Sequence, residues 1–183
     1  VRAGIKPALV LYTEAWAETA AGQRLLPLLR PAEDGDWLVS EPVMAACADT
    51  DSPQGVLAVL PSVQLEPREG LALILDAVRD PGNLGTILRS AEAAGAGQVL
   101  LAPGTVDLYN PKVVRGAMGA HFRLPVQSLD WPDIAGRVAG RAVWLADAAG
   151  GVAYDAVDWR QPSALIVGGE AAGAGEEAGA LAT

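Results

Sequence analysis

Apolar residues along the chain form short runs, separated by polar stretches rich in proline and glycine. The run at Leu71–Leu75 is continuously apolar, a pattern typical of a strand that is buried on both faces. A loop containing Asp, Pro and Gly follows at Asp76–Gly82. Apolar residues then recur at helical spacing over Asn83–Ala94, and Asn83 is a good N-cap residue. The chain is organised around this strand, loop and helix.

The same alternation continues to the end of the chain. We expect helices over Pro111–Met118 and Pro132–Ala139, a segment toward Val126, and strands over Gln98–Leu101, Ala142–Leu145 and Ala164–Val167. Strands that alternate with helices predict an α/β fold, in which a parallel sheet has helices on both faces. Such sheets bind ligands at the carboxyl ends of their strands, so the Asp76–Gly82 loop is expected at a ligand edge.

The first sixty residues predict a separate small α/β module. Its expected elements are a helix beginning at Ser40, a long helix over Glu14–Leu29, and strands over Ala8–Tyr12, Trp37–Val39 and Gly55–Leu60. A polar stretch with two prolines follows and reads as a linker. The predicted organisation is therefore a module at residues 1–61, a linker at 62–70 and a second domain at 71–183.

Three motifs in the second domain resemble those of one family. Asp80–Arg89 reads DPGNLGTILR, Asn110–Arg115 reads NPKVVR with Gly119 following, and Leu165–Gly173 reads LIVGGEAAG. In this order and at these spacings, they resemble the motifs of the SpoU (TrmH-type) RNA 2′-O-ribose methyltransferases of the SPOUT superfamily. One such motif would be a weak signal, whereas three in order are specific.

The resemblance implies a SPOUT-type fold with a trefoil knot, preceded by part of a small RNA-binding domain. It also implies S-adenosyl-L-methionine-dependent 2′-O-methylation of a ribose in structured RNA, with ribosomal RNA preferred over transfer RNA, and a homodimer. One alternative is a non-catalytic RNA-binding member of the same fold. Another is a methyltransferase that acts on a different nucleotide position.

The resemblance assigns catalytic roles to three residues: Arg89 at the ribose hydroxyl, Asn83 as organiser of the loop, and Glu170 as its support. Arginine stays charged, so we expect Arg89 to stabilise a developing oxyanion rather than to accept a proton. The alternative for Arg89 is a surface ion pair with Glu92, three positions further along the helix. Helix capping alone would explain Asn83.

The resemblance also implies residues that bind the cofactor and the RNA. The cofactor loop is expected to contain Gly168, Gly169 and Gly173, with Leu145 and Ala146 at a neighbouring strand end. The expected RNA contacts are Arg79, Lys112 and Arg115. Lys112 and Arg115 lie three positions apart and share a helix face, which could equally be a solvated surface. Ala117 stands where the family often has serine.

The charge distribution supports an RNA partner in only one part of the chain. The formal net charge of the 183 residues is −9, which is unusual for an RNA-binding protein. The segment 76–123 nevertheless carries five basic and four acidic residues, a net charge of +1. A cationic edge on an acidic body is compatible with RNA contact and discourages indiscriminate nucleic-acid binding, so no DNA partner is expected.

Several classes of site lack their sequence signals. Neither a G-x-G-x-x-G fingerprint nor a P-loop occurs. The single cysteine, Cys47, and the single histidine, His121, argue against a zinc site, and we expect no metal. One cysteine permits no internal disulfide and suits a cytoplasmic location. No apolar run is long enough for a membrane span, so no membrane partner is expected.

The ends of the chain suggest a fragment. The first residue is Val rather than Met, and the last is Thr183. The family's third motif, which contains Ile-Pro-Met and Ser-Leu-Asn, would begin near that residue. We therefore expect that the knot and the cofactor pocket are incomplete in these residues alone.

Overall fold

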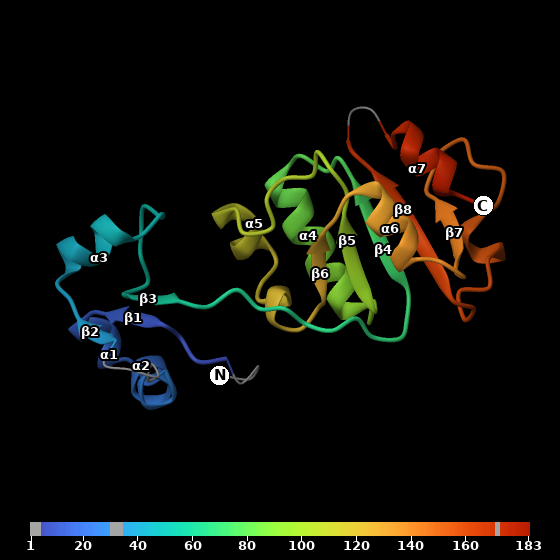
Figure 1. The fold of residues 1–183 in the computed structure, drawn as a ribbon. Helices are drawn as coiled ribbons and strands as arrows, with labels where there is room; N and C mark the ends of the chain where they lie inside the picture. The colour runs from blue at the N-terminus through green and yellow to red at the C-terminus, as the bar shows by residue number, and fades with distance from the viewer. Residues whose placement is uncertain (1–4, 30–34, 171–172) are drawn as a thin grey trace. The chain divides into compact units, whose positions relative to one another are not determined.

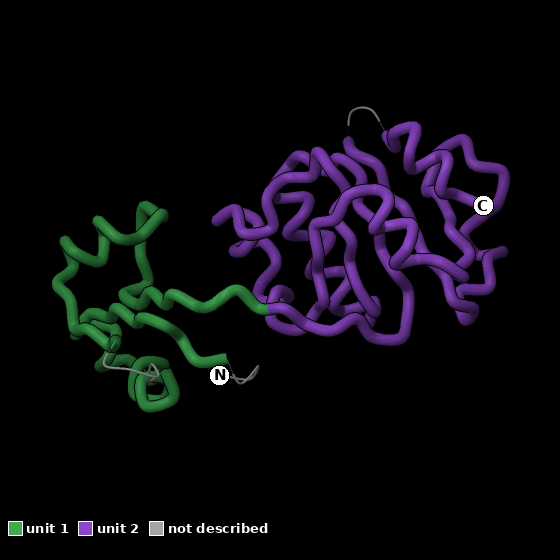
Figure 2. The backbone as a smooth tube through the Cα atoms, in the orientation of Figure 1, with its two compact units in different colours: residues 1–63 green, residues 64–183 purple. Residues whose placement is uncertain are grey.

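The computed structural model describes residues 5–29, 35–170 and 173–183. The chain divides into two compact units, residues 1–63 and 64–183 (Figure 2). The division falls inside the stretch predicted as a linker. The last part of that stretch is held on the second unit, where the Arg68 N–H donates to the Gly97 carbonyl at 3.1 Å. Arg141 also donates through Nη1 to the Gly70 carbonyl at 2.7 Å.

The first unit is a three-stranded sheet with short helices (Figure 1). Strand β1 lies between the other two, parallel to β2 and antiparallel to β3. Its elements are β1 (Leu9–Tyr12), α1 (Glu14–Ala17), α2 (Ala20–Leu25), η1 (Leu26–Leu28), β2 (Asp36–Leu38), α3 (Glu41–Cys47) and β3 (Val56–Val59). These bounds match the predicted strands to within a residue or two.

The single long helix predicted over Glu14–Leu29 is wrong, because three short helical segments occupy this region. The break lies at Thr19, whose Oγ1 accepts from the Gly22 N–H at 3.0 Å and so begins α2. The same hydroxyl donates to the Trp16 carbonyl at 2.7 Å. A threonine that binds the backbone on both sides ends one helix and starts the next, which apolar periodicity does not reveal.

The second unit contains a five-stranded sheet in the order β6-β5-β4-β8-β7. All its strand pairs are parallel, which confirms the predicted parallel sheet. Its strands are β4 (Ala72–Asp76), β5 (Gln98–Leu101), β6 (Val126–Ser128), β7 (Ala142–Leu145) and β8 (Ser163–Gly168). Its helices are α4 (Pro81–Ala93), α5 (Pro111–Gly116), η2 (Ala120–Phe122), α6 (Trp131–Arg137), η3 (Tyr154–Ala156) and α7 (Glu176–Leu181). The segment toward Val126 is thus the edge strand β6.

Alternate residues of the central strands face two cores, which makes the unit three layers thick. Leu73 and Leu75 of β4 pack with residues of α4 and α5, including Leu84 and Val113. Ala72 and Ile74, together with β8 residues, pack with residues of α6 and α7. All five residues of β4 are buried, as expected for a strand covered on both faces. Helices therefore cover both sides of the sheet (Figure 1).

Helix α4 begins earlier than predicted. Its N-cap is Asp80, whose Oδ1 accepts from the Asn83 N–H at 2.8 Å, and Pro81 occupies the first turn. The predicted N-cap, Asn83, is therefore wrong, because Asp80 supplies the capping oxygen and leaves the Asn83 side chain available for another contact. At the other end, Gly95 has φ +75° and the Ala96 N–H donates to the Ala91 carbonyl, a Schellman-type termination.

Candidate active site

The carboxyl ends of β4 and β8 form the candidate site. The two strands are neighbours, with Asp76 paired in register with Gly168. The chain after β4 leads through α4 to β5, whereas the chain after β8 leads to α7, which packs against β7 on the other side. Two neighbouring strands whose continuations diverge define a topological switch point, where open α/β sheets bind ligands.

Two predicted site residues meet at this edge. The Asn83 side-chain amide donates through Nδ2 to Glu170 Oε1 at 2.8 Å, although 87 positions separate the two residues in sequence. Asn83 lies in the first turn of α4, and Glu170 lies in the loop that follows β8. The contact joins the motif at the start of α4 to the glycine-rich motif after β8.

Backbone donors surround the same carboxylate. The Arg79 N–H lies 3.5 Å from Glu170 Oε2, a long hydrogen bond. The hydrogen bond from Asn83, reinforced by the backbone N–H groups of Glu170 itself, Arg79 and Asp80, holds the pKa of the Glu170 carboxyl below its ordinary value. Glu170 is therefore ionised at neutral pH. It accepts hydrogen bonds that link the loop after β8 to the segment after β4.

Asp76 also lies at the edge formed by β4 and β8, although its sequence context predicts only a loop residue. It is the last residue of β4, is 6% exposed, and accepts from the Gly175 N–H through Oδ2 at 2.6 Å. Gly175 is the N-cap of α7, so this bond fixes the far end of the loop that carries Glu170. An Asp directly after four apolar strand residues is the sequence signal for a buried carboxylate at a strand end.

Arg89 lies on α4 as predicted, exposed and away from the apolar stripe. The alternative pairing with Glu92 is wrong, because Glu92 binds Arg123 at 2.8 Å instead. Among the residues that the structure describes, Arg89 has no ion pair or side-chain hydrogen bond. Six positions place it about 9 Å along the axis from Asn83. Helical side chains lean toward the N-terminus, so the guanidinium can extend toward the edge that holds Asn83.

The glycines after β8 are required by contacts within the chain itself. A Cβ on Gly168 would collide with the backbone of Gly173 and Ala174, and one on Gly169 with the carbonyl oxygen of Ala77. Gly169 and Gly173 pair through two backbone hydrogen bonds of 3.0 Å. Gly173 also has φ +69°. Residues 171–172, which complete the predicted motif, lie outside the described residues.

Small residues also occur at the neighbouring strand end. Leu145 ends β7 and is partly buried, Ala146 is exposed, and the Ala146 N–H donates to the Ile166 carbonyl at 2.9 Å. Because β7 and β8 are parallel neighbours, these residues lie beside Gly168 at the same edge of the sheet. Small residues at this edge present main-chain N–H and carbonyl groups of the kind that bind a nucleoside-type cofactor.

The predicted RNA-contact residues lie on the surface near this edge. Arg79 is exposed in the loop between β4 and α4, and Lys112 and Arg115 are exposed on α5. Helix α5 packs closely on α4, because a Cβ on Gly85 would lie 2.9 Å from the Gly116 Cα. The absence of a side chain at Gly85 permits this close approach.

Further observations concern one motif position, metal binding and membrane spans. Ala117, at the family's frequent serine position, is buried at 1% exposure. In the part of the chain that the structure describes, no group of three or more His, Cys, Asp or Glu is arranged to hold a metal ion. Within the same residues, no helix has the length and apolar character needed to cross a bilayer.

Known proteins share both the fold and the sequence of this unit. A crystal structure of an rRNA methyltransferase from Sinorhizobium meliloti superposes on 99% of the chain and 71% of its own length, with a TM-score of 0.82 and 31% identity. An AdoMet complex of the SpoU methyltransferase AviRb from Streptomyces viridochromogenes covers 99% of the chain and 73% of its own length, with a TM-score of 0.80 and 26% identity. The fold is therefore that of the SPOUT methyltransferases.

The family model of the SpoU rRNA methylases matches residues 70–183. A 23S rRNA (guanosine(2553)-2′-O)-methyltransferase of Bacillus subtilis, RlmP, is 38% identical over 141 residues, which are 75% of this chain and 56% of that protein. The mitochondrial rRNA methyltransferase 3 of Xenopus tropicalis is 47% identical over 112 residues, 55% of this chain and 27% of that protein. The chain belongs to the SpoU rRNA methylase family, and it spans about a quarter to a half of these relatives' lengths.

Proposed function

We propose that the whole protein carrying this chain is an S-adenosyl-L-methionine-dependent methyltransferase that modifies a ribose 2′-hydroxyl in structured RNA, ribosomal RNA rather than transfer RNA. The observation that carries the proposal is the 2.8 Å hydrogen bond between Asn83 and Glu170. It joins two family motifs at the switch point between β4 and β8. Family membership and the 2′-O-methyltransferase activity of the Bacillus relative support it.

The proposed catalytic residue is Arg89. A ribose hydroxyl is a poor nucleophile near neutral pH, so its oxygen needs stabilisation as its negative charge develops. A guanidinium presents five N–H donors and stays charged, and a donor of this kind contributes about 2.7–4 kcal/mol in oxyanion holes. Because Arg89 cannot accept the hydroxyl proton, that proton passes to solvent or to another group.

Asn83 and Glu170 are proposed to hold the site together. The oxygens of Glu170 accept from Asn83 and from the Arg79 N–H, and its pKa is lowered, both of which make it a poor proton acceptor. Its role is to position the α4 loop against the β8 loop. Correct placement of two reactants can supply about 7–11 kcal/mol of a barrier, so this positioning matters as much as proton transfer.

S-adenosyl-L-methionine, when bound, supplies an electrophilic methyl group on a sulfonium. The residues proposed to hold it are those at the adjoining ends of β7 and β8: Leu145, Ala146, Gly168, Gly169 and Gly173. An AdoMet complex of a neighbour with a TM-score of 0.80 supports this choice of cofactor. Arg79, Lys112 and Arg115 are proposed to contact RNA phosphates, and the first unit to bind RNA.

The trefoil knot, the homodimer and the cytoplasmic location remain proposals as well. The knot and the dimer rest on the family resemblance, and the location rests on the single cysteine among 183 residues. Light scattering of the whole protein would measure its mass in solution, and a mass of one protomer would contradict the dimer.

The activity is tested with the whole protein, total bacterial RNA and radiolabelled S-adenosyl-L-methionine, followed by alkaline digestion. A 2′-O-methyl group blocks cleavage at its own phosphodiester, so the label should appear in alkali-resistant dinucleotides. Label in mononucleotides would indicate base methylation instead. Retained RNA binding without any label would favour the non-catalytic alternative.

A further inference from the structure

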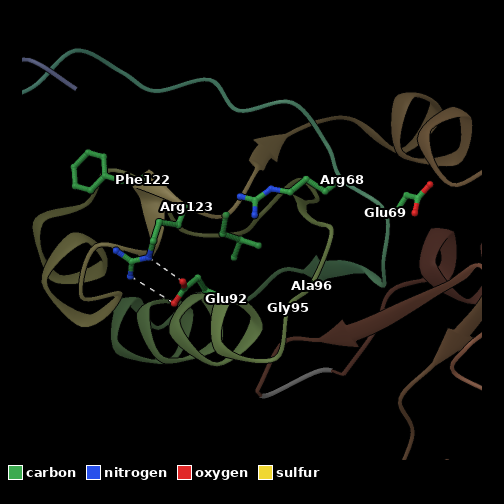
Figure 3. A pocket seen from close by; sticks show the side chains of 8 residues that line it. Arg68, Glu69, Glu92, Gly95, Ala96, Phe122 and Arg123 are labelled. Atoms are coloured by element: carbon green, nitrogen blue, oxygen red, sulfur yellow. Dashed lines mark hydrogen bonds and ion pairs between the residues drawn. The ribbon is translucent and has the colours of Figure 1, made fainter. Parts of the chain in front are cut away.

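A polar cavity lies at the opposite end of α4 from the candidate active site. It measures about 340 Å³, and its walls come from the segment before β4, the end of α4 and the segment that follows η2. Its lining residues are Arg68, Glu69, Glu92, Gly95, Ala96, Phe122, Arg123 and Leu124 (Figure 3). All of them belong to the second unit.

The cationic side chains of this cavity are held in place. Arg123 binds Glu92 through Nε at 2.8 Å and Nη2 at 3.5 Å, which fixes the plane of its guanidinium. The backbone of Arg68 is fastened to Gly97, and its side chain extends toward the Arg123–Glu92 pair (Figure 3). Glu69 points away from them (Figure 3). The charged lining residues are thus two arginines and two glutamates, of which Glu92 is paired with Arg123.

An aromatic ring stands beside these cations. Phe122 is partly exposed, and its Cδ2 atom lies 3.8 Å from the Cβ position of Gly119, with Arg123 Nη1 at 3.6 Å from the same point. The ring and the guanidinium therefore flank one glycine. Arg68 has no ion pair within the described part of the chain. After the hydrogen bond from Arg123, its charge helps to lower the pKa of Glu92, and its guanidinium makes no hydrogen bond within the described residues, so its N–H donors can serve a ligand.

We propose that this cavity binds one nucleotide of a single-stranded segment of the RNA substrate, with the base on Phe122 and the phosphate on Arg68. Aromatic rings that stack a base beside arginines that contact the backbone are the recurring chemistry of single-strand recognition. With Arg123 paired to Glu92, the guanidinium of Arg68 supplies the N–H donors that suit one phosphate. The inference rests on the proposed function and adds a second contact with the same RNA.

The length of α4 sets where this nucleotide lies relative to the methylated one. Nine positions separate Asn83 from Glu92, or about 14 Å along the helix axis. Stacked single strands advance about 3.4 Å per phosphate, so the anchored nucleotide lies about four positions from the target in a stacked strand.

The test compares Arg68→Gln, Phe122→Leu and a matched control, Arg137→Gln, in the whole protein. Arg137 is exposed on α6, so the control removes the same charge away from the cavity. The probe is a labelled rRNA fragment that the wild type methylates, with Kd measured by anisotropy across a salt series. Melting temperatures report whether Phe122→Leu is folded.

Arg68→Gln should weaken binding severalfold and reduce the slope of log K against log salt by about 0.7, the value for one phosphate of a single strand. Phe122→Leu should weaken binding about tenfold with an unchanged slope, because stacking is not ionic. Arg137→Gln should match the wild type. In the methylation assay, the effect of Arg68→Gln should fall on the KM for RNA rather than on kcat.

Wild-type affinity and slope in both cavity variants would overturn the inference while leaving the proposed function intact. Competition by an oligoglutamate peptide but not by oligouridylate, lost in Arg68→Gln, would overturn it in favour of an acidic protein partner. A wild-type protein that neither methylates nor binds RNA would overturn the proposed function and this inference together.

Discussion

Asn83 donates a 2.8 Å hydrogen bond to Glu170, 87 positions away in sequence. The bond links the segment after β4 to the loop after β8. The contact is possible because Asp80, and not Asn83, caps α4. An asparagine in the first turn of a helix is therefore free to bind a neighbouring loop through its side chain. The site depends on two residues of one motif, three positions apart, that perform different tasks.

The Asn83 contact predicts how Glu170 titrates. Its folded pKa lies below the ordinary value of 4.5, chiefly because of the Asn83 hydrogen bond. A lowered pKa means that the stabilisation is fully present above pH 4.5 and is lost as the pH falls through the lowered folded value. In an NMR titration, Asn83→Ala should raise the pKa of Glu170 toward 4.5, whereas Asn110→Ala, at the cap of α5, should not. An unchanged titration in Asn83→Ala would show that the contact is absent in solution.

Arg89→Ala should abolish methyl transfer without unfolding the protein. Arg89 is exposed and has no ion pair within the described residues, so its loss removes no native contact of consequence. The loss of one oxyanion donor should lower kcat by about 100- to 1,000-fold. Kinetics of the whole protein measure this, and the melting temperature should stay within a few degrees. Wild-type kcat in Arg89→Ala would exclude its proposed role.

Asp76→Ala should destabilise the second unit. The substitution removes the carboxylate acceptor of the part-buried 2.6 Å hydrogen bond from the Gly175 N–H, which costs about 1–3 kcal/mol of unfolding free energy. Urea denaturation measures this cost. The control is Asp155→Ala, an exposed aspartate in η3, which should change stability by less than about 0.5 kcal/mol. Equal stabilities for the two variants would contradict the structural role of Asp76.

Substitution by alanine should lower the free energy of unfolding at Gly85 and raise it at Gly136, although both glycines lie in helices. At Gly85 the new Cβ would lie 2.9 Å from the Gly116 Cα and would push α5 from α4, at a cost of about 1–3 kcal/mol. At Gly136, in α6, nothing lies within 4 Å, so Gly136→Ala should stabilise by about 0.5–1 kcal/mol. Thermal unfolding of both variants measures the difference. Stabilisation by Gly85→Ala would show that the helices do not pack closely.

Sequence patterns predict the strands and helices of the second unit well, because each is marked by the apolar pattern of its own residues. The apolar run before Asp76 identifies β4, and the apolar spacing after Pro81 identifies α4. Motif resemblance pointed to Asn83 and Glu170 separately, but periodicity cannot show that their side chains meet. That contact depends on β8 lying beside β4, a pairing between segments about 90 positions apart.

The errors have local physical causes as well. Asp80 and Asn83 are both good capping residues, and only the position of Pro81 in the first turn favours Asp80. Thr19 splits a stretch that has helical spacing, because its side chain competes for backbone hydrogen bonds. The Asp, Pro and Gly content of residues 76–82 predicts a loop that includes Asp76, whereas Asp76 ends β4, and its acceptor role depends on Gly175, 99 positions away.

The position of β8 has a consequence for how the chain acquires its structure. β8 lies between β4 and β7, so the last strand of the described sheet is one of its central strands. During synthesis from the N-terminus, β4 can pair with β5 on one side while its other edge stays open until residues 163–168 emerge. An open apolar edge of this kind can pair with other chains. The candidate ligand edge, which needs both strands, forms in the same late step, so the geometry of the candidate site and protection of this sheet edge arise together.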